Sequence, residues 1–236
     1  TQPTQFQNTM PALASLALWR SQLQQGQQHL RQQFERDANT VRLIHQQCKL
    51  VDRILGNLWK TIAIPQEICL VAVGGFGRGE LFPFSDVDLL ILLPRQQDAI
   101  LTVQLEQLVG LMWDVGLTVG HSVRTIDECV AEAANDVTIR TSLLEARLLR
   151  GNRILYRRFT QALASAMDSQ GFLKAKINEQ AMRHARFHDT AYKLEPNIKE
   201  SPGGLRDLQS VLWIARGLGI ADSWNGLVRA GLITPA

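Results

Sequence analysis

Two aspartates, Asp86 and Asp88, are separated by one residue, Val87, where the largely apolar run Val87–Leu93 begins. If the run is a strand, side chains two residues apart point to the same face, separated by about 6.6 Å of rise. Carboxylates held together on an apolar strand raise one another's pKa values and destabilise the fold unless a cation neutralises them. Because the ions of two-metal sites lie about 3.5–4 Å apart, this pair has a spacing suited to divalent cations. The alternative is an exposed strand end at which Asp86 only caps the preceding turn.

A glycine-rich segment, GGFGRGEL at 74–81, precedes the aspartates and follows the apolar run Ile68–Val73. Glycines leave backbone N–H groups unobstructed, and at the start of a helix such groups bind phosphate. The segment has neither the G-x-G-x-x-G spacing of dinucleotide-binding proteins nor the Gly-Lys-Ser/Thr of a Walker A motif. Taken alone, it therefore indicates either a phosphate-binding turn or a simple tight turn between a strand and a helix.

A second glycine pair, Gly203-Gly204, precedes an amphipathic segment near the end of the sequence. As bare sequence it predicts a capped helix with Ser201 as the N-cap. Glycines at a helix start can also receive an anion, and Lys199 or Arg206 would then add positive charge.

The elements that must position these residues follow from the periodicity of the apolar side chains. Two buried strands are predicted at 68–73 and 87–93, with the glycine-rich turn and a short helix between them. A helix is predicted from Leu101 to Val115, and a third strand at 117–123. From Ile126 onward the pattern is almost wholly helical, so no further strand is expected.

Composition bounds the kind of protein. Of 236 residues, 45% are hydrophobic and 20% charged, which is typical of a folded globular chain and excludes intrinsic disorder. The apolar runs are far shorter than the ~20 residues of a membrane helix. Residues 61–139 carry 11 acidic and 3 basic side chains, whereas both flanks are basic. The three widely spaced cysteines predict buried, reduced thiols and a cytoplasmic protein.

The glycine-rich turn followed by Ser85-Asp86-x-Asp88 on an apolar strand resembles the nucleotidyltransferase superfamily that includes DNA polymerase β. Within it, the strings GGFGRGELFPFSDVDLLILL, GLTVGHSVRT and PNIKESPGGLRDLQSVLWIA are similar to those of the bacterial PII uridylyltransferase/uridylyl-removing family, GlnD. This resemblance implies an α+β fold, in which a polymerase β-type mixed sheet is flanked by mainly helical N- and C-terminal regions.

The family resemblance also implies an activity, namely transfer of UMP from UTP to a tyrosine hydroxyl of the PII nitrogen-regulatory protein, with Mg²⁺ as cofactor and pyrophosphate as product. Asp86 and Asp88 match the catalytic, metal-binding carboxylates. The expected nucleotide-binding residues are Gly74, Gly75, Arg78, Ser85, Lys199, Gly203 and Gly204. The implied partners are UTP and PII, and neither nucleic acid nor a membrane is expected.

Three parts are expected along the chain: a helical arm (1–62), a nucleotidyltransferase domain (63–136) and a helical domain that closes the nucleotide cleft (137–236). The uridylyl-removing hydrolase domain of the family would lie outside this segment.

The superfamily usually carries a third acidic residue on a later strand, but Gly116–Thr125 contains none. His121 would be on that strand and is a candidate to accept the tyrosine proton, or else a hydrogen-bonded strand histidine. Two other functions stay open: a related transferase that uses ATP or modifies another protein or small molecule, and a nucleotide-binding regulatory module without turnover.

Overall fold

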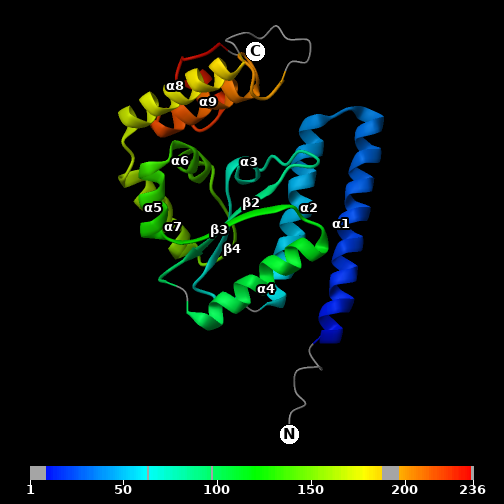
Figure 1. The fold of residues 1–236 in the computed structure, drawn as a ribbon. Coiled ribbons are helices and arrows are strands. Elements are labelled where there is room, and N and C mark those ends of the chain that lie inside the picture. Colours follow the sequence, from blue (N-terminus) through cyan, green and yellow to red (C-terminus); the bar gives the residue numbers. More distant parts are fainter. Residues whose placement is uncertain (1–8, 63, 97, 188–196, 235–236) are drawn as a thin grey trace. The chain divides into compact units, whose positions relative to one another are not determined.

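Four strands form one mixed sheet in the computed structural model, which describes residues 9–62, 64–96, 98–187 and 197–234 (Figure 1). The strands are β1 (Cys69–Ala72), β2 (Val87–Leu93), β3 (Val119–Thr125) and β4 (Arg147–Gly151), in the spatial order β3-β2-β1-β4. β1 runs antiparallel to β2 and β4, whereas β2 and β3 are parallel. A parallel pair needs a crossover connection, and helix α4 (Ala99–Val115) provides it.

Helices account for most of the remaining described residues. Besides α4 they are α1 (Thr9–Asp37), α2 (Thr40–Thr61), α3 (Gly74–Gly77), α5 (Ile126–Asn135), α6 (Val137–Leu144), α7 (Arg153–Ser165), α8 (Ser169–Arg186), α9 (Leu205–Gly217) and α10 (Trp224–Arg229). Contacts divide the chain into two compact units. Unit 1 comprises Thr1–Cys129 and Glu145–Gln161, and unit 2 comprises Val130–Leu144 and Ala162–Ala236. The division into three domains stays a prediction.

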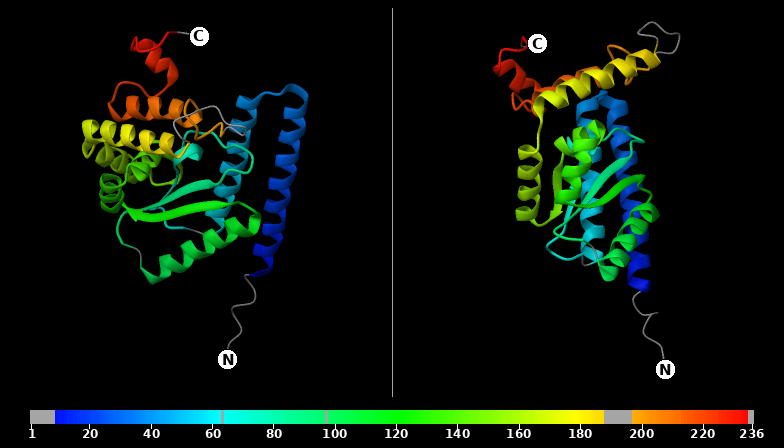
Figure 2. Two further views of the ribbon diagram at one scale, coloured as in Figure 1. Left: turned by 45° about the horizontal axis from the view of Figure 1, so that its top comes forward. Right: turned by 60° about the vertical axis from the view of Figure 1, so that its left-hand side comes forward.

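One face of the sheet in unit 1 is buried under α2 and α4. Apolar side chains recur on α2 every three to four residues, which is the period of a helix with one buried face. Figure 2 shows α1 running antiparallel to α2 on its outer side. The shared core of this face includes Val51, Ile54, Leu58, Leu70, Ala72, Leu89, Ile91, Leu108 and Met112.

The described part of the chain has no helix whose length and apolarity would let it cross a bilayer. Cys48, Cys69 and Cys129 are free and buried, which confirms the prediction of buried thiols. Burial raises the pKa of the Cys48 and Cys69 thiols to about 11 and that of Cys129 to about 12. All three therefore remain protonated near neutral pH and are poor nucleophiles.

Two expectations about strands need correction. The third strand lies at Val119–Thr125 rather than at 117–123, because α4 ends in a left-handed Gly116 and the N–H of Leu117 still bonds back to the O of Met112. The second error is larger. A fourth strand, β4, follows Ile126, in a region for which only helices were expected.

Strand β4 was missed because its polar side chains obtain partners only in the folded state. Arg147 donates to the Asp52 carboxylate at 2.8 and 3.1 Å, and its guanidinium lies 5.3 Å from the ring centroid of Phe76. Arg150 lies against Gly56 of α2, where an added Cβ would come within 2.1 Å of a guanidinium nitrogen. Neither contact leaves a periodic signal in the local sequence.

Candidate active site

Asp86 and Asp88 lie at the amino-terminal end of β2, and both are exposed. Val87 and Leu89, their neighbours in sequence, are buried in the core beneath the helices. Since side chains alternate between the faces of a strand, Asp88 projects from the face opposite that core. Asp86 precedes it by two residues, so the strand period directs both carboxylates to the same side.

Asp88 is paired across the sheet with Gly120 of β3. A Cβ added to Gly120 would lie 2.9 Å from Oδ1 of Asp88, so the carboxylate lies directly over the glycine. Residues opposite each other in a parallel pair share a face. Position 120 is therefore the place on β3 from which a further side chain would reach the aspartates, and it has no side chain.

His121 lies on the other face of the sheet. Its register partner is Leu89, a core residue, and its ring packs edge-on against Trp113 of α4 with centroids 6.3 Å apart. The sheet therefore separates the imidazole from the Asp88 carboxylate. The structure does not bring His121 to the aspartates, and its candidacy as the base that takes the tyrosine proton is not supported.

The glycine-rich turn lies beside Asp88. The N–H of Val73, the residue before the turn, donates to the O of Asp88 at 3.1 Å. Gly74 then takes a left-handed backbone (φ 57°), a conformation that glycine adopts without steric cost, and begins the four-residue helix α3. Gly74 and Asp88, 14 positions apart in the sequence, are thus brought together.

Arg78 is held against this turn by two carboxylates. Its Nη1 donates to Glu145 at 2.5 Å and its Nε to Glu80 at 3.0 Å. Burial lowers the pKa of Arg78, but the hydrogen bonds and charges of Glu145 and Glu80 together outweigh it, so the net shift is upward and the guanidinium stays charged. Its Nη2 lies 3.6 Å from where a Cβ on Gly75 would be, which leaves this nitrogen facing the turn.

Ser85, which directly precedes the aspartates, is exposed, and its N–H donates to the O of Phe82 at 3.1 Å. Phe84, next to it, has a positive φ of 67° and a fully exposed ring. The part of the predicted site that unit 1 brings together is Gly74, Gly75, Arg78, Ser85, Asp86 and Asp88.

The rest of the predicted site belongs to unit 2. Lys199 is exposed in the loop before α9. The N–H of Gly203 donates to Oδ2 of Asp207 at 2.6 Å, and that of Gly204 donates to the O of Ser201 at 2.8 Å. Both N–H groups that were expected to receive an anion are therefore bonded within the chain. A ligand-binding role for these two glycines stays a prediction.

The expected N-cap of α9 was wrong. Gly204 occupies that position without a side-chain hydrogen bond, and the hydroxyl of Ser201 instead accepts from the N–H of Asn197 at 3.1 Å. Gly204 is required by close packing, because a Cβ there would lie 2.6 Å from the O of Ile198. Asp207 fixes the loop to the helix through its bond to Gly203.

The aspartates fit a divalent cation of the Mg²⁺ type. Carboxylate oxygens are the ligands that such hard cations prefer, and the absent side chain at Gly120 leaves room beside Asp88. Within the ranges that the structure describes, no three His, Cys, Asp or Glu residues are grouped so as to hold a metal. Two carboxylates suit an ion that completes its shell with water and phosphate oxygens.

Sequence reasoning missed Gly120 and Glu145. A signal for Gly120 was present, since a glycine inside a strand pattern often marks close approach by another group. Glu145 left none, because its significance depends on a contact with Arg78, 67 residues away.

Comparison with known proteins gives the family. Residues 48–149 match the family model described as a nucleotidyltransferase domain, and residues 171–236 match that of GlnD PII-uridylyltransferase. The first match contains all the unit 1 site residues, and the second contains the loop with Lys199. The α+β fold predicted from the sequence, a mixed sheet flanked by helices, is confirmed.

Among curated relatives, the bifunctional uridylyltransferase/uridylyl-removing enzyme of Burkholderia lata is 49% identical over 215 residues, 91% of this chain and 25% of that protein. The enzyme of the same name from Cupriavidus metallidurans is 47% identical over 227 residues, 96% of this chain and 26% of that protein. The chain thus spans about a quarter of the length of these relatives. On the strength of this identity and of the two model matches, the chain belongs to the GlnD PII-uridylyltransferase family, where it corresponds to the nucleotidyltransferase portion.

Proposed function

We propose that this chain transfers UMP from UTP to a tyrosine hydroxyl of a PII protein and releases pyrophosphate, in the cytoplasm and with Mg²⁺. One observation supports this proposal most. The turn at Gly74 lies next to Asp88, because the N–H of Val73 donates to the O of Asp88, and both lie in the segment that matches the nucleotidyltransferase model. Phosphate binding and carboxylate ligands at one end of a sheet are what this transfer requires.

In the proposed reaction the tyrosine oxygen forms a bond to the α-phosphorus of UTP. The bond from that phosphorus to the bridging oxygen breaks, and pyrophosphate leaves with the electron pair. Asp86 and Asp88 would hold the divalent cation, which when bound neutralises phosphate charge and stabilises the leaving group. The tyrosine proton passes to solvent or to a base other than His121.

The remaining residues of unit 1 orient the triphosphate. The backbone of the Gly74–Gly75 turn offers N–H groups to phosphate oxygens, and Arg78 adds a fixed positive charge beside them. The side chain of Glu145 is only 2% exposed. Its carboxylate therefore holds Arg78 from a buried position. Catalysis of phosphoryl transfer depends mainly on such positioning and charge.

The reaction is tested by following label from α-phosphate-labelled UTP into PII, with labelled ATP as the comparison. We expect label on PII from UTP in the presence of Mg²⁺ and none from ATP. Transfer from ATP alone would establish a related transferase with another base preference. Binding of UTP without label transfer or pyrophosphate release would establish a regulatory module and overturn the proposal.

Replacing Gly120 with alanine tests the geometry of the metal site. The new methyl carbon would lie 2.9 Å from Oδ1 of Asp88, so the carboxylate must turn away. We expect Mn²⁺ binding, followed by electron paramagnetic resonance in the presence of UTP, to weaken about tenfold, a cost of about 1.4 kcal/mol. Gly110→Ala is the control, since a Cβ there meets nothing within 4 Å. Unchanged Mn²⁺ affinity in Gly120→Ala would contradict a cation position beside Asp88 and Gly120.

A further inference from the structure

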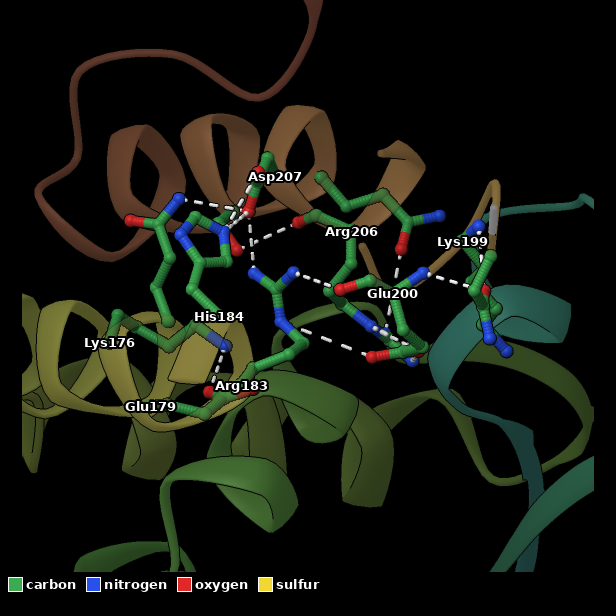
Figure 3. A network of polar contacts seen from close by, with 12 residues as sticks. Lys176, Glu179, Arg183, His184, Lys199, Glu200, Arg206 and Asp207 are labelled. Carbon is green, nitrogen blue, oxygen red and sulfur yellow. Dashed lines mark hydrogen bonds and ion pairs between the residues drawn. The ribbon is translucent and has the colours of Figure 1, made fainter. Parts of the chain in front are cut away.

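A second concentration of charge lies between α8 and the loop that leads into α9, wholly within unit 2 (Figure 3). We call it the Arg183–Arg206 cluster. Its members are Lys176, Glu179, Arg183, His184, Glu200, Arg206 and Asp207. Some ions of the cluster make short hydrogen bonds and others make long ones. The bond lengths indicate which contacts are fixed and which can exchange.

Asp207 is tightly bonded. It accepts from Nη2 of Arg183 at 2.6 Å, from Nε2 of Gln180 at 2.9 Å and from the N–H of Gly203 at 2.6 Å, and His184 lies 3.0 Å away. Burial would raise the pKa of Asp207, but the bonds from Arg183 and its other donors hold it well below the usual range. Asp207 is therefore a fixed anion that ties the loop to both helices.

Glu200 is loosely bonded by comparison. Its Oε1 lies 3.2 and 3.3 Å from two nitrogens of Arg206, and its Oε2 lies 3.9 Å from Nε of Arg183. Charge-assisted hydrogen bonds are normally about 2.7–2.9 Å long. Both arginines therefore face a carboxylate that satisfies neither of them well.

Arg183 carries the clearest sign of an unmet bond. The residue is 7% exposed, and its Nε is buried with no hydrogen-bond partner in the described part of the chain. A buried donor without an acceptor costs about 1–3 kcal/mol. The Glu200 carboxylate lies 3.9 Å from this nitrogen, and the side chains of Glu200 and Arg206 are 30% and 28% exposed.

Lys176 is a further buried cation near Arg206. Lys176, with a side chain only 1% exposed, pairs with Glu179 and lies 4.4 Å from the ring centroid of Trp213. Arg206 lies 5.3 Å from the same ring. The pKa of Lys176 is lowered, chiefly by burial and further by Arg206 and Arg183. Lys176 and Arg206 thus place two positive groups against the Trp213 ring, and Glu179 pairs with Lys176.

We propose that Arg183 and Arg206 form a binding site for a phosphate group, and that the Glu200 carboxylate fills this site until phosphate displaces it. A phosphate offers several acceptor oxygens in the geometry that guanidinium groups bind, so one group can serve Nε of Arg183 and the planar edge of Arg206 together. The partly exposed edge formed by Glu200 and Arg206 is the entry route.

The Glu200 side chain can leave without unfolding the loop. The backbone N–H of Glu200 donates to Oδ1 of Asn197 at 2.9 Å, and its O accepts from Nη1 of Arg183 at 3.1 Å. These bonds, and that from Gly203 to Asp207, do not involve the Glu200 carboxylate. The exchange is therefore confined to one side chain.

The phosphate can belong to free pyrophosphate or to the triphosphate of a nucleotide, and one experiment separates them. Titration calorimetry without metal and without PII measures binding of pyrophosphate and of UTP to the chain and to Glu200→Gln. Removal of the competing negative charge should raise pyrophosphate affinity about five- to tenfold. An equal rise for UTP identifies the triphosphate as a ligand, and no change for UTP identifies free pyrophosphate.

Three further variants complete the test. Arg206→Gln should lower affinity at least tenfold, and Arg206→Lys should lower it less, because lysine keeps the charge but loses the planar edge. Glu35→Gln, which removes the same charge from the exposed pair with Arg31 on α1, should change nothing. If Glu200 serves only structure, Glu200→Gln will lower the melting temperature and leave both affinities unchanged or weaker, and that result overturns the inference. Because no turnover is measured, the outcome does not depend on the proposed transfer to PII.

Discussion

Asp88→Asn is expected to reduce the transfer of UMP to PII about a thousandfold or more, with little loss of folding stability. The exposed carboxylate lies over Gly120 and beside the glycine turn, where it would hold the cation that faces the phosphates. Asparagine keeps the shape but removes the negative charge, so about 4 kcal/mol of transition-state stabilisation would be lost at about 1.4 kcal/mol per tenfold change in rate. Asp86→Asn should have an effect of the same order.

Initial rates of label transfer from UTP, measured at saturating Mg²⁺, provide the test. Asp114→Asn is the matched control, because Asp114 is an exposed aspartate on α4 and lies away from the aspartate face of the sheet. Melting temperatures of all three variants will show whether the fold is retained. Rates near that of the unmodified chain in Asp86→Asn and Asp88→Asn would refute the assignment of the metal carboxylates.

The second large effect is expected on stability. In Gly77→Ala the new Cβ would lie 1.9 Å from the O of Glu145 and 3.0 Å from the O of Ala72, and both are backbone atoms. Either α3 moves away from the start of β4 or the strand itself shifts. We expect the free energy of unfolding to fall by about 3 kcal/mol, the upper range for overpacking.

Urea denaturation measures this loss, and Gly110→Ala provides a control of opposite sign. Gly110 lies inside α4 with open space around it, so alanine there should stabilise the helix by up to about 1 kcal/mol. Gly77→Ala should also impair UMP transfer, because the displaced residue belongs to α3, which contains the glycine turn proposed to bind phosphate. A Gly77→Ala protein as stable as the parent would mean that the turn and β4 are not packed as the structure shows.

Much of unit 1 was predictable from local sequence. The β2 bounds follow from the largely apolar run Val87–Leu93, which only Asp88 interrupts, and α4 follows from apolar residues at helical spacing. The glycine-rich turn and the Asp86–Asp88 pair were recognisable because each depends on neighbours in sequence: a positive φ at Gly74 and the two-residue period of a strand.

What local sequence did not show were contacts between distant segments. β4 was missed because Arg147 and Arg150 are stabilised by Asp52 and by the space at Gly56, nearly a hundred residues earlier. Arg78 was expected at the nucleotide, yet its position is set by Glu145. Similarly, the loose hold on Glu200 by Arg183 and Arg206 is visible only in the distances.

The sequence alone thus showed the residue types of the candidate site and their order. A glycine-rich turn follows one predicted strand, and paired carboxylates begin the next. Which side chains meet was decided by the register of β3 against β2, because a shift of one residue moves every side chain of a strand to the other face. The observed register sets Gly120 opposite Asp88 and His121 opposite Leu89. It thereby leaves open space beside the carboxylate and puts the imidazole on the far side of the sheet, and only tertiary pairing could determine this.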